Sequence, residues 1–480
     1  MRRHTHPARI ATELKRYVFL LLLPVAQQLL TLPFEPWAWS LLLWQELFAA
    51  LAVVLLAVWR WARLWYTVKD GEILVESGIF LQKQISLRFR DVSSADVERP
   101  LWLLILGGAR LRLDTAAGSR RKADVELYLP TRRALSIAAM VKGHSRATDI
   151  SSSYRANPFF VAVMAASASN AAGGILFAVP VVKGIGQLLG QEIEAQILGT
   201  IGTLATFLVA VLPPATALLA TILAVGWLIA FVRVFLRYVR FSLRRTQGRL
   251  TVSSGAVGRY RSVLGTRHIC ALDVRQGLLL HLMGLASVNV ICVGYGKQEG
   301  QKAVLLPCVR KRKARESCRE ILPEFAGPGR LSIRPQKGTL RRYILYPCVG
   351  LLLIPPGAYL VQILLSPFSA LVPFLAAVLA VLCLWMMVVS LLSYYEAGVA
   401  LEKPVCRFTC RKRLSLHEVQ VPAQKVQRLA LTQTPFQKQA GLCHLRVTVV
   451  GERGTSYVIR HLPAKEVRAA IDRFYGEGPK

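Results

Sequence analysis

The phrase LILGGARLRL at residues 104–113 and the phrase HLMGLASVNV at residues 281–290 are two versions of one pattern. In both, a Gly is followed two residues later by Ala, and polar and apolar residues then alternate, as they do in a β-strand that leaves a turn. A shift of 177 residues carries Gly107 onto Gly284, and a further shift of 157 carries Gly284 onto Gly441. The chain therefore contains the same structural unit three times.

The repetition extends across three polar blocks, each with alternating positions that predict strands. Each block ends in a Leu-Pro pair and a helix-like segment, as at Leu129, Leu306 and Leu462. Pro suits the first turn of a helix, because its missing N–H would have no partner there. Each unit is therefore predicted to be a small strand-rich module closed by one helix. Equivalent strand positions are Val92, Ile269 and Val426; Leu111, Val288 and Leu445; and Leu113, Val290 and Val447.

The last of the closing helices is amphipathic. Val467, Ala470, Ile471 and Phe474 recur at helical spacing and fall on one face. This face is expected to cover the strands of the third module.

Composition points to a membrane. Hydrophobic residues make up 53% of the 480 residues, and the mean hydropathy of +0.41 is too high for a typical soluble protein. The 61 Lys and Arg residues outnumber the 27 Asp and Glu residues and give a formal charge of +34. Such a charge implies an anionic partner, and together with the high hydropathy it favours lipid over nucleic acid.

Six apolar runs approach or exceed the roughly 20 residues that a membrane-spanning helix needs. They occur in three pairs, and one pair precedes each polar block. The fourth run is unusually long and is interpreted as one span kinked at Pro213–Pro214 and preceded by an interfacial or membrane-embedded piece; a span with a re-entrant piece is the alternative. The runs are Tyr17–Phe34 and Trp37–Trp59, Pro158–Val182 and Ala195–Val232, and Tyr343–Leu365 and Phe368–Leu392.

The distribution of positive charge predicts the orientation of these spans. All Lys and Arg residues except Lys183 lie before Tyr17 or in residues 60–157, 233–342 and 396–480. By the positive-inside rule, both termini and all three blocks are cytoplasmic. No small-x-small cleavage site follows the first apolar run, so an uncleaved anchor is expected. The predicted location is the bacterial plasma (inner) membrane, crossed six times.

The modules resemble a known family. Short strands closed by a C-terminal helix, together with the Leu-Gly-x-Ala phrase, are similar to the bacterial pleckstrin-homology (PH) domain. Three such domains, each after a pair of spans, look like the YdbT-like membrane proteins. The third block departs from the pattern at residues 395–398, which lack the Ser-Gly pair of the other two. The phrases that carry the resemblance are DVERP at 96–100, LGGARL at 106–111, GYGK at 294–297, VPAQKVQ at 421–427 and QKQAGL at 437–442.

The resemblance implies an α+β membrane protein in which each pair of transmembrane helices is followed by a PH-like β-sandwich or barrel with a C-terminal helix. It implies no enzymatic reaction, and a companion subunit with a single PH-like domain is consistent with it. The predicted division of the chain is an N-terminal tail and first transmembrane pair at 1–65, PH-like domain 1 at 66–145, transmembrane pair 2 at 158–237, PH-like domain 2 at 238–326, transmembrane pair 3 at 343–394 and PH-like domain 3 at 395–477.

No motif for a cofactor, a metal or catalysis stands out. Cys406 and Cys410, with His417, Cys443 and His444, lack the spacing of a zinc site, and small buried strand residues are the preferred interpretation. The GYGK phrase lacks the Gly-Lys-Ser/Thr of a phosphate loop, so a hairpin turn between strands ending near Val293 and beginning near Ala303 is expected. The chain is expected to be no enzyme and to have no cofactor and no metal.

Basic clusters remain as candidate contacts for anionic lipid headgroups or partner proteins. A purely topological role for these charges is the alternative interpretation, and no nucleic-acid reading motif accompanies them. The candidate residues are Arg120, Arg121 and Lys122 in a predicted hairpin turn; Arg259 and Arg261 in the first hairpin of block two; Arg310, Lys311, Arg312 and Lys313 on the closing helix of that block; and Arg411, Lys412 and Arg413 in block three.

These sequence features bear on three functions. The favoured one is a non-enzymatic scaffold or adaptor, whose three cytoplasmic modules bind other membrane proteins or anionic headgroups. The second is a lipid-handling or transport protein that uses the six spans, although ionisable residues, which such a function would require, are almost absent from them apart from Glu46. The third is a membrane-embedded enzyme, for which no residue constellation is found.

Overall fold

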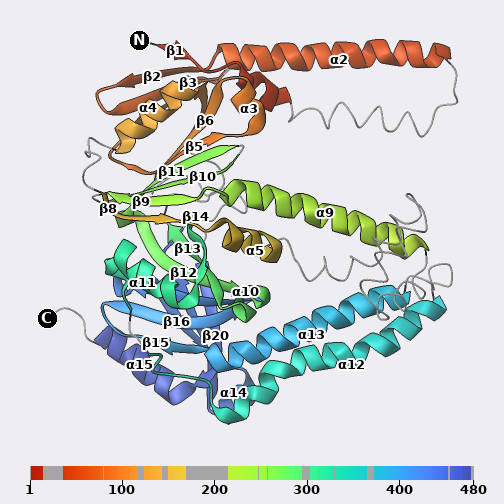
Figure 1. The fold of residues 1–480 in the computed structure, drawn as a ribbon, viewed down its shortest axis with the longest axis vertical. Helices are drawn as coiled ribbons and strands as arrows, with labels where there is room; N and C mark the ends of the chain where they lie inside the picture. Colours follow the sequence, from red (N-terminus) through yellow and green to blue (C-terminus); the bar gives the residue numbers. More distant parts are fainter. Residues whose placement is uncertain are drawn as a thin grey trace. The chain divides into compact units, whose positions relative to one another are not determined.

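The computed structural model describes residues 2–14, 36–78, 81–115, 124–142, 150–168, 214–246, 248–256, 258–293, 303–327, 330–364, 372–451 and 455–476 (Figure 1). The chain forms two compact units. The first contains residues 1–153, 243–268 and 293–301, and the second contains residues 154–242, 269–292 and 302–480.

The first unit contains a four-stranded antiparallel sheet and most of a seven-stranded one. The smaller sheet has the order β1-β2-β3-β4, and in the larger, β5, β6 and β7 form one end. Apolar side chains of β2 to β7 form one core, which α4 (Thr131–Lys142) closes. The strands are β1 (Arg3–His4), β2 (Trp65–Lys69), β3 (Glu72–Ser77), β4 (Lys83–Arg88), β5 (Val92–Arg99), β6 (Gly108–Thr115) and β7 (Val125–Pro130).

The seven-stranded sheet has the order β7-β6-β5-β11-β10-β9-β8. Its second half comes from the following block of sequence: β8 (Ile150–Arg155), β9 (Ser242–Thr246), β10 (Arg249–Ser254) and β11 (Arg259–Gly265). A short 3-10 turn, η1 (Thr266–His268), follows β11.

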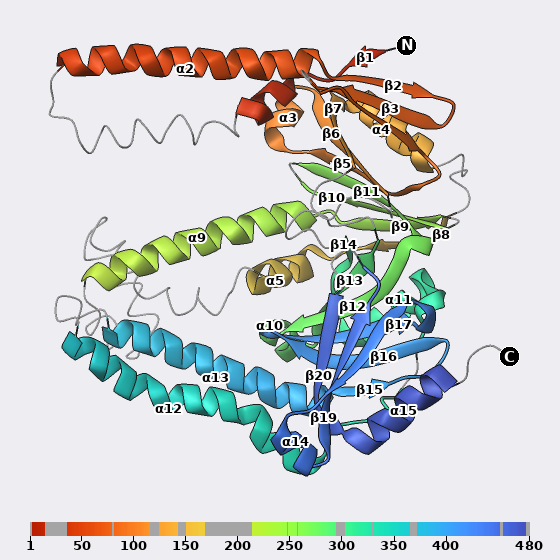
Figure 2. The ribbon, with the colours of Figure 1, turned by 180° about the vertical axis from the view of Figure 1, so that it is seen from behind.

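The second unit contains a six-stranded sheet with the order β14-β13-β12-β17-β16-β15 and a three-stranded sheet with the order β18-β19-β20 (Figure 2). Helices α11 (Lys311–Ile321) and α15 (Ala464–Gly476) follow the last strands of blocks two and three. The strands are β12 (Ile269–Gly277), β13 (Leu285–Cys292), β14 (Ala303–Arg310), β15 (Gly398–Ala400), β16 (Val405–Lys412), β17 (Ser415–Pro422), β18 (Val426–Thr432), β19 (Leu442–Val449) and β20 (Thr455–Pro463). The two strands predicted on either side of GYGK are confirmed as β13 and β14, which pair antiparallel, whereas residues 294–302 of the predicted turn lie outside the described residues.

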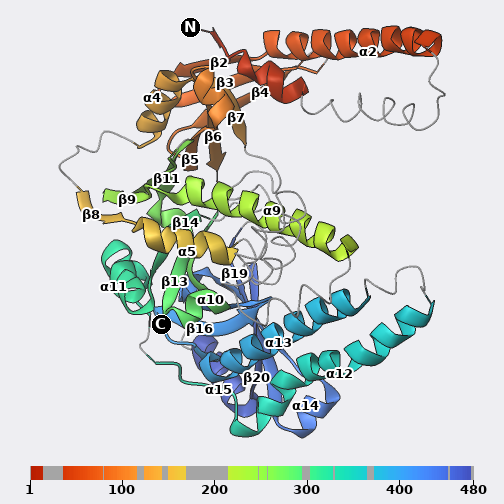
Figure 3. The same cartoon turned by 45° about the vertical axis from the view of Figure 1, so that its right-hand side comes forward.

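The predicted six spans are confirmed only in part. Within the described residues, two helices are long and apolar enough to cross a membrane, Lys337–Leu364 and Leu375–Glu396. They correspond to the fifth and sixth predicted spans and contain α12 (Leu340–Leu364) and most of α13 (Val372–Glu396). The two helices lie side by side, also in the turned view of Figure 3 (Figures 1, 2 and 3).

The other predicted spans are only partly within the described residues. Helix α2 (Pro36–Ala62) covers the second predicted span. Helix α5 (Pro158–Ala168) covers the start of the third, and α9 (Pro214–Tyr238) covers the end of the fourth. The first span, the rest of the third and the region before the proposed kink at Pro213–Pro214 lie outside the described residues.

The phrase that repeats along the chain forms the same kind of turn in all three blocks. A short helix precedes each of its glycines, α3 (Leu101–Ile105), α10 (Leu278–Leu282) and α14 (Pro435–Gln439). Gly107, Gly284 and Gly441 have φ values of +69°, +65° and +65°, in the left-handed region that favours glycine.

The carbonyl group of each of these glycines also accepts a hydrogen bond from the first residue of the closing helix of its block. The carbonyl of Gly107 accepts a hydrogen bond from the N–H of Thr131 at 3.2 Å. The carbonyls of Gly284 and Gly441 accept equivalent bonds from Lys311 at 2.9 Å and Ala464 at 2.8 Å. The donor is in each case the first residue of α4, α11 or α15. The repeated phrase therefore sets where the last helix of each module begins.

The predicted place of the Leu-Pro pairs needs a correction. Pro130 and Pro463 are the last residues of β7 and β20, and the helix begins one residue later in both cases. Pro307 instead lies inside β14, and α11 begins only at Lys311. Because β14 is an edge strand of its sheet, a residue without an N–H can be accommodated there.

The predicted apolar face of α15 is largely confirmed. Val467, Ala470 and Phe474 are buried, whereas Ile471 is half-buried.

The sheets do not end where the sequence blocks end. Strand β5 of block one pairs antiparallel with β11 of block two, and β12 of block two pairs antiparallel with β17 of block three. We call these two pairings the interdomain joints. Each joint continues the second half-sheet of one block into the first half-sheet of the next, which the sequence repeats did not predict.

Each joint contains a buried carboxylate. Asp96 on β5 accepts a hydrogen bond from the hydroxyl of Ser262 on β11. Asp273 on β12 bonds Nδ1 of His417 on β17 at 2.7 Å, and the hydroxyl of Tyr457 donates to it at 3.3 Å. Each joint is therefore stabilised by side-chain hydrogen bonds in addition to the main-chain hydrogen bonds between its strands.

We expect Gly441→Ala to destabilise the third module by roughly 1–2 kcal/mol, because an L-residue pays that cost in the left-handed region. The added methyl group would meet no atom within 4 Å, so the effect is conformational. Denaturant unfolding of the protein in detergent measures it. Gly338→Ala, at a glycine with equally open surroundings and an ordinary φ, is the control and should change little. Equal effects of both changes would contradict the assignment.

Asp96 should make the stability of the first unit depend on pH. Burial, together with the charge of Glu98, raises the pKa of Asp96 from 3.8 to about 7. The folded protein therefore keeps the Asp96 proton that the unfolded chain loses above pH 3.8. The resulting stabilisation is present below pH 3.8 and is lost as pH rises through about 7, in total roughly 4 kcal/mol.

Asp96→Asn removes this titration and keeps a donor and an acceptor for Ser262. We expect the unfolding midpoint of the variant to exceed that of the wild type at pH 8, with a smaller difference at pH 5. The control variant is Asp91→Asn, at an exposed position, which should leave the pH dependence of the unfolding midpoint unchanged. Parallel pH profiles of Asp96→Asn and wild type would show that the buried carboxyl does not titrate in this range.

Candidate functional site

The basic residues predicted in the first two blocks have different environments. Arg120, Arg121 and Lys122 lie outside the described residues. Arg259 and Arg261 are exposed on β11, which pairs with β10 and therefore belongs to the second hairpin of block two and not, as predicted, to the first. Because β11 lies between β10 and β5, their side chains project from the middle of a sheet and not from a loop.

The basic cluster at the start of α11 is partly neutralised within the protein. Arg310 ends β14, and residues 311–313 form the first turn of the helix. Positive charge is unfavourable at this end of a helix, and the Nζ of Lys311 pairs with Glu396 at 2.7 Å. Arg310, Arg312 and Lys313 remain exposed to solvent.

The three basic residues of block three point to different places. The Nζ of Lys412 lies 4.9 Å from the centre of the Tyr457 ring. Arg413 occupies the turn after β16 with a φ of +57°. Arg411 extends toward α13 and donates a hydrogen bond to the hydroxyl of Ser390. The structure therefore separates these neighbours in sequence and directs only Arg411 toward the apolar helices.

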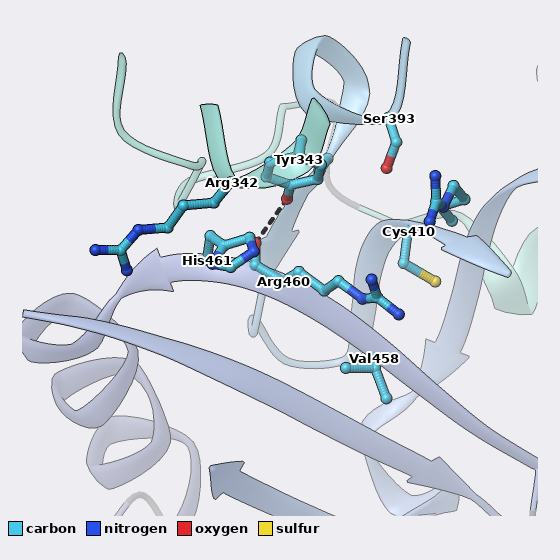
Figure 4. A pocket seen from close by; sticks show the side chains of 9 residues that line it. Arg342, Tyr343, Ser393, Cys410, Val458, Arg460 and His461 are labelled. Carbon is cyan, nitrogen blue, oxygen red and sulfur yellow. Dashed lines mark hydrogen bonds between the residues drawn. The ribbon is translucent and has the colours of Figure 1, made fainter. Parts of the chain in front are cut away.

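Arg411 is part of a recess that other elements complete (Figure 4). Arg342 comes from the first turn of α12, and Arg460 comes from β20. We call this the cationic recess. Its lining is Arg342, Tyr343, Ser393, Ala397, Cys410, Arg411, Val458, Arg460 and His461, without a carboxylate.

Tyr343 attaches the helix hairpin to the third module. Its hydroxyl donates to the carbonyl of Arg460 at 2.7 Å, and its ring lies edge-on to that of His461 at 5.1 Å. Tyr394 of α13 contacts the same ring of Tyr343 at 5.8 Å. The ends of α12 and α13 are therefore fixed against β20, and the recess has defined walls.

The charge of the recess is carried by its arginines. None of Arg342, Arg411 and Arg460 makes an ion pair with any residue that the structure describes. Burial and the nearby charge of Arg460 lower the pKa of Arg411, as expected for a cation without a counter-ion.

The other titratable groups of the recess are neutral at pH 7. Burial lowers the pKa of His461 to about 4, and His444 and the arginines add to this effect. Burial raises the pKa of the Cys410 thiol to about 12. Neither side chain changes charge near neutrality, so the recess is positive over the physiological pH range.

A second recess in the same unit shows the contrast. It is lined by Arg315, Arg319 and Arg407, among others. Here Glu418 pairs with Arg407 at 2.8 Å and with Arg315 at 3.2 Å. Its charge is therefore partly compensated within the protein, whereas that of the cationic recess is not.

The cationic recess lies at the domain end of the two apolar helices. Arg342 is two residues from the start of α12, and Ser393 is three residues from the end of α13. In a membrane, this level corresponds to the lipid headgroups, and guanidinium groups pair with phosphate through two parallel hydrogen bonds. The recess is narrow and has room for about one water molecule.

Sequence reasoning found Arg411 but missed Arg342 and Arg460. The three residues come from α12, β16 and β20, and only the fold brings them together. One signal was available, because Arg341 and Arg342 directly precede an apolar run. That position alone indicates orientation and not a site.

The cysteines of β16, Cys406 and Cys410, lie where the sequence predicted them, as buried strand residues. Within the described residues, no three His, Cys, Asp or Glu side chains are arranged to hold a metal ion.

Comparisons with known proteins agree with the architecture. A family model described as "Bacterial PH domain" matches residues 18–144, 196–324 and 356–476. The UPF0699 transmembrane protein YdbT of Bacillus subtilis (strain 168) is 23% identical over 457 residues, which cover 86% of this chain and 89% of that protein. No solved structure matches the chain. With three matches over most of its length and this relative, the chain belongs to the bacterial PH domain family, as a YdbT-like membrane protein with three such domains.

Proposed function

We propose that this protein is a non-enzymatic membrane scaffold, whose PH-like domains lie on the cytoplasmic side of the bacterial plasma membrane and bind anionic headgroups or partner proteins. The observation that carries this proposal is the cationic recess. Arg342, Arg411 and Arg460, none of them ion-paired with a residue that the structure describes, line an opening at the domain end of two apolar helices. The guanidinium groups of Arg342 and Arg460 point to opposite sides of this opening (Figure 4). Such a group of charges is favourable only where an anion reaches it.

The recess differs from a general basic surface in its construction. Arg411 is held by Ser390, and Arg460 belongs to the strand that Tyr343 binds. Fixed side chains lose less conformational entropy when they bind a phosphate than mobile surface lysines do. We therefore assign the phosphate of an anionic lipid to the recess and a topological role to the exposed Arg312 and Lys313.

The first test compares lipid binding of matched charge variants. Arg342→Gln combined with Arg460→Gln removes two cations from the recess, and Arg312→Gln combined with Lys313→Gln removes two from the surface of α11. Each cation near an anionic surface contributes roughly 1 kcal/mol, so the recess variant should bind about 30-fold more weakly. The α11 variant should bind nearly as the wild type does.

The measurement is calorimetric titration of the detergent-solubilised protein with dihexanoyl phosphatidylglycerol. Dihexanoyl phosphatidylcholine and inorganic phosphate are titrated separately, to distinguish a lipid from a free anion. An equal loss of lipid affinity in both variants would show that the recess acts only through general electrostatic attraction and is not a specific site. Equal affinity for the two lipids would contradict the proposal that the recess recognises an anionic headgroup.

The second test concerns orientation. Lys83→Cys, Arg312→Cys and Lys438→Cys each place a thiol at an exposed position in a different block. With all domains cytoplasmic, a membrane-impermeant maleimide should label each variant in inverted vesicles and none in intact spheroplasts. Wild-type protein gives the background from the native cysteines. Labelling of any one position in spheroplasts would contradict a common cytoplasmic side.

A further inference from the structure

The two interdomain joints are built in the same way, from equivalent strands of successive blocks. Asp96 faces Ser262 in the first joint, and Asp273 faces Val419 in the second. A shift of 177 residues carries Asp96 onto Asp273, and a shift of 157 carries Ser262 onto Val419. The joints therefore pair equivalent strands in the same antiparallel register.

This arrangement of three blocks leaves two strand edges unpaired among the described residues, one in the first block and one in the third. Strand β18 is the third equivalent of β5 and β12, since Leu431 faces Leu445 as Val97 faces Leu111. Strand β4 is the first equivalent of β11 and β17, and it forms the edge of its sheet. Within the part of the chain that the structure describes, no strand pairs with the outer edge of β4 or of β18.

Solvent exposure reflects this difference. All residues of β5 except Arg99 are buried, and β12 is buried over most of its length. In β18, by contrast, no residue is buried, although Leu429, Ala430 and Leu431 form an apolar run. Strand β4 is likewise exposed except at Ile85 and Leu87. An open strand edge is a ready template for another strand.

The shape of β18 fits such a pairing. All three equivalent strands contain a register shift, which begins at Val92 in β5, at Ile269 in β12 and at Val426 in β18. Because β5 and β12 are paired despite this irregularity, it does not protect the edge of β18. Neither β4 nor β18 contains a proline that would prevent main-chain bonding.

We propose that β18 of one copy of this protein pairs antiparallel with β4 of a second copy, and so forms a third joint of the same kind. In the register of the other two joints, Ala430 faces Ile85 and Thr432 faces Lys83. An apolar pair thus takes the place of the Asp96–Ser262 pair, and no carboxylate is left without a partner. A second copy is the occupant that the chain itself specifies, because it carries the missing strand.

The resulting contact is heterologous, since each copy contributes a different edge. Such contacts close into rings when the rotation between copies allows it and otherwise extend into rows. Anchoring by the apolar helices keeps the copies in one plane, where either arrangement would array the domains along the membrane.

Disulfide formation between differently tagged copies tests this register. One copy carries Lys83→Cys and the other Thr432→Cys, and both positions are exposed. Directly opposed residues lie within the distance that a disulfide spans, so oxidation of isolated membranes should give a product that contains both tags. The pair Arg88→Cys and Thr432→Cys is five residues out of register and should give little. Each single variant reports the background from native cysteines.

A second pair of variants tests the same contact without cross-linking. Ala430→Asp introduces a carboxyl group into the proposed joint and should lower the fraction of associated copies at least tenfold in a size measurement in detergent. Ile85→Ser recreates the Asp–Ser pair of the first joint and should restore association when combined with Ala430→Asp. Unfolding midpoints of the purified variants confirm that each folds.

Several results would overturn the proposal. These are absence of the two-tag product from the in-register pair, a disulfide within a single copy, and a product that joins Thr432→Cys to a different polypeptide. Unchanged association of the Ala430→Asp variant would also exclude β18 from the contact. None of these results depends on the lipid that the cationic recess binds.

Discussion

Antiparallel pairing between strands of successive domains is the constraint on which the rest of the structure depends. The second PH-like block contributes half of the seven-stranded sheet and half of the six-stranded one, so main-chain hydrogen bonds continue across both block boundaries. Buried Asp96 and Asp273 mark the two joints and bond side chains of the neighbouring block. A carboxylate buried without such partners would be costly, so these contacts favour the observed register over its alternatives.

This pairing explains why one sequence phrase recurs three times. The glycine of the phrase turns the chain after a short helix, and its carbonyl receives the first N–H of the closing helix. The strand after the glycine then lies beside the strand that takes part in a joint. One turn therefore positions both the edge that meets the next block and the helix that closes its own.

The cationic recess shows how the same scaffold can serve a membrane. Tyr343 fixes the hairpin of α12 and α13 to β20, and this attachment lets Arg342 line the same recess as Arg460 and Arg411. Burial keeps His461 and Cys410 uncharged at neutral pH, so the charge of the recess comes from its arginines. The proposed phosphate site depends on this group of cations without counter-ions, since guanidinium groups pair well with phosphate, whereas the second recess is already partly balanced by Glu418.

The sequence by itself determined the repeat, the strand-rich modules with closing helices, the apolar runs and the family, because these depend on periodicity, charge and glycine positions within short stretches. It did not determine that Pro307 lies in a strand, since the position of α11 follows from the contact between Gly284 and Lys311. Nor did it reveal the joints or the recess. Strand partners are chosen by which edges the fold leaves open, and Arg342, Arg411 and Arg460 converge only when a helix and two distant strands pack together.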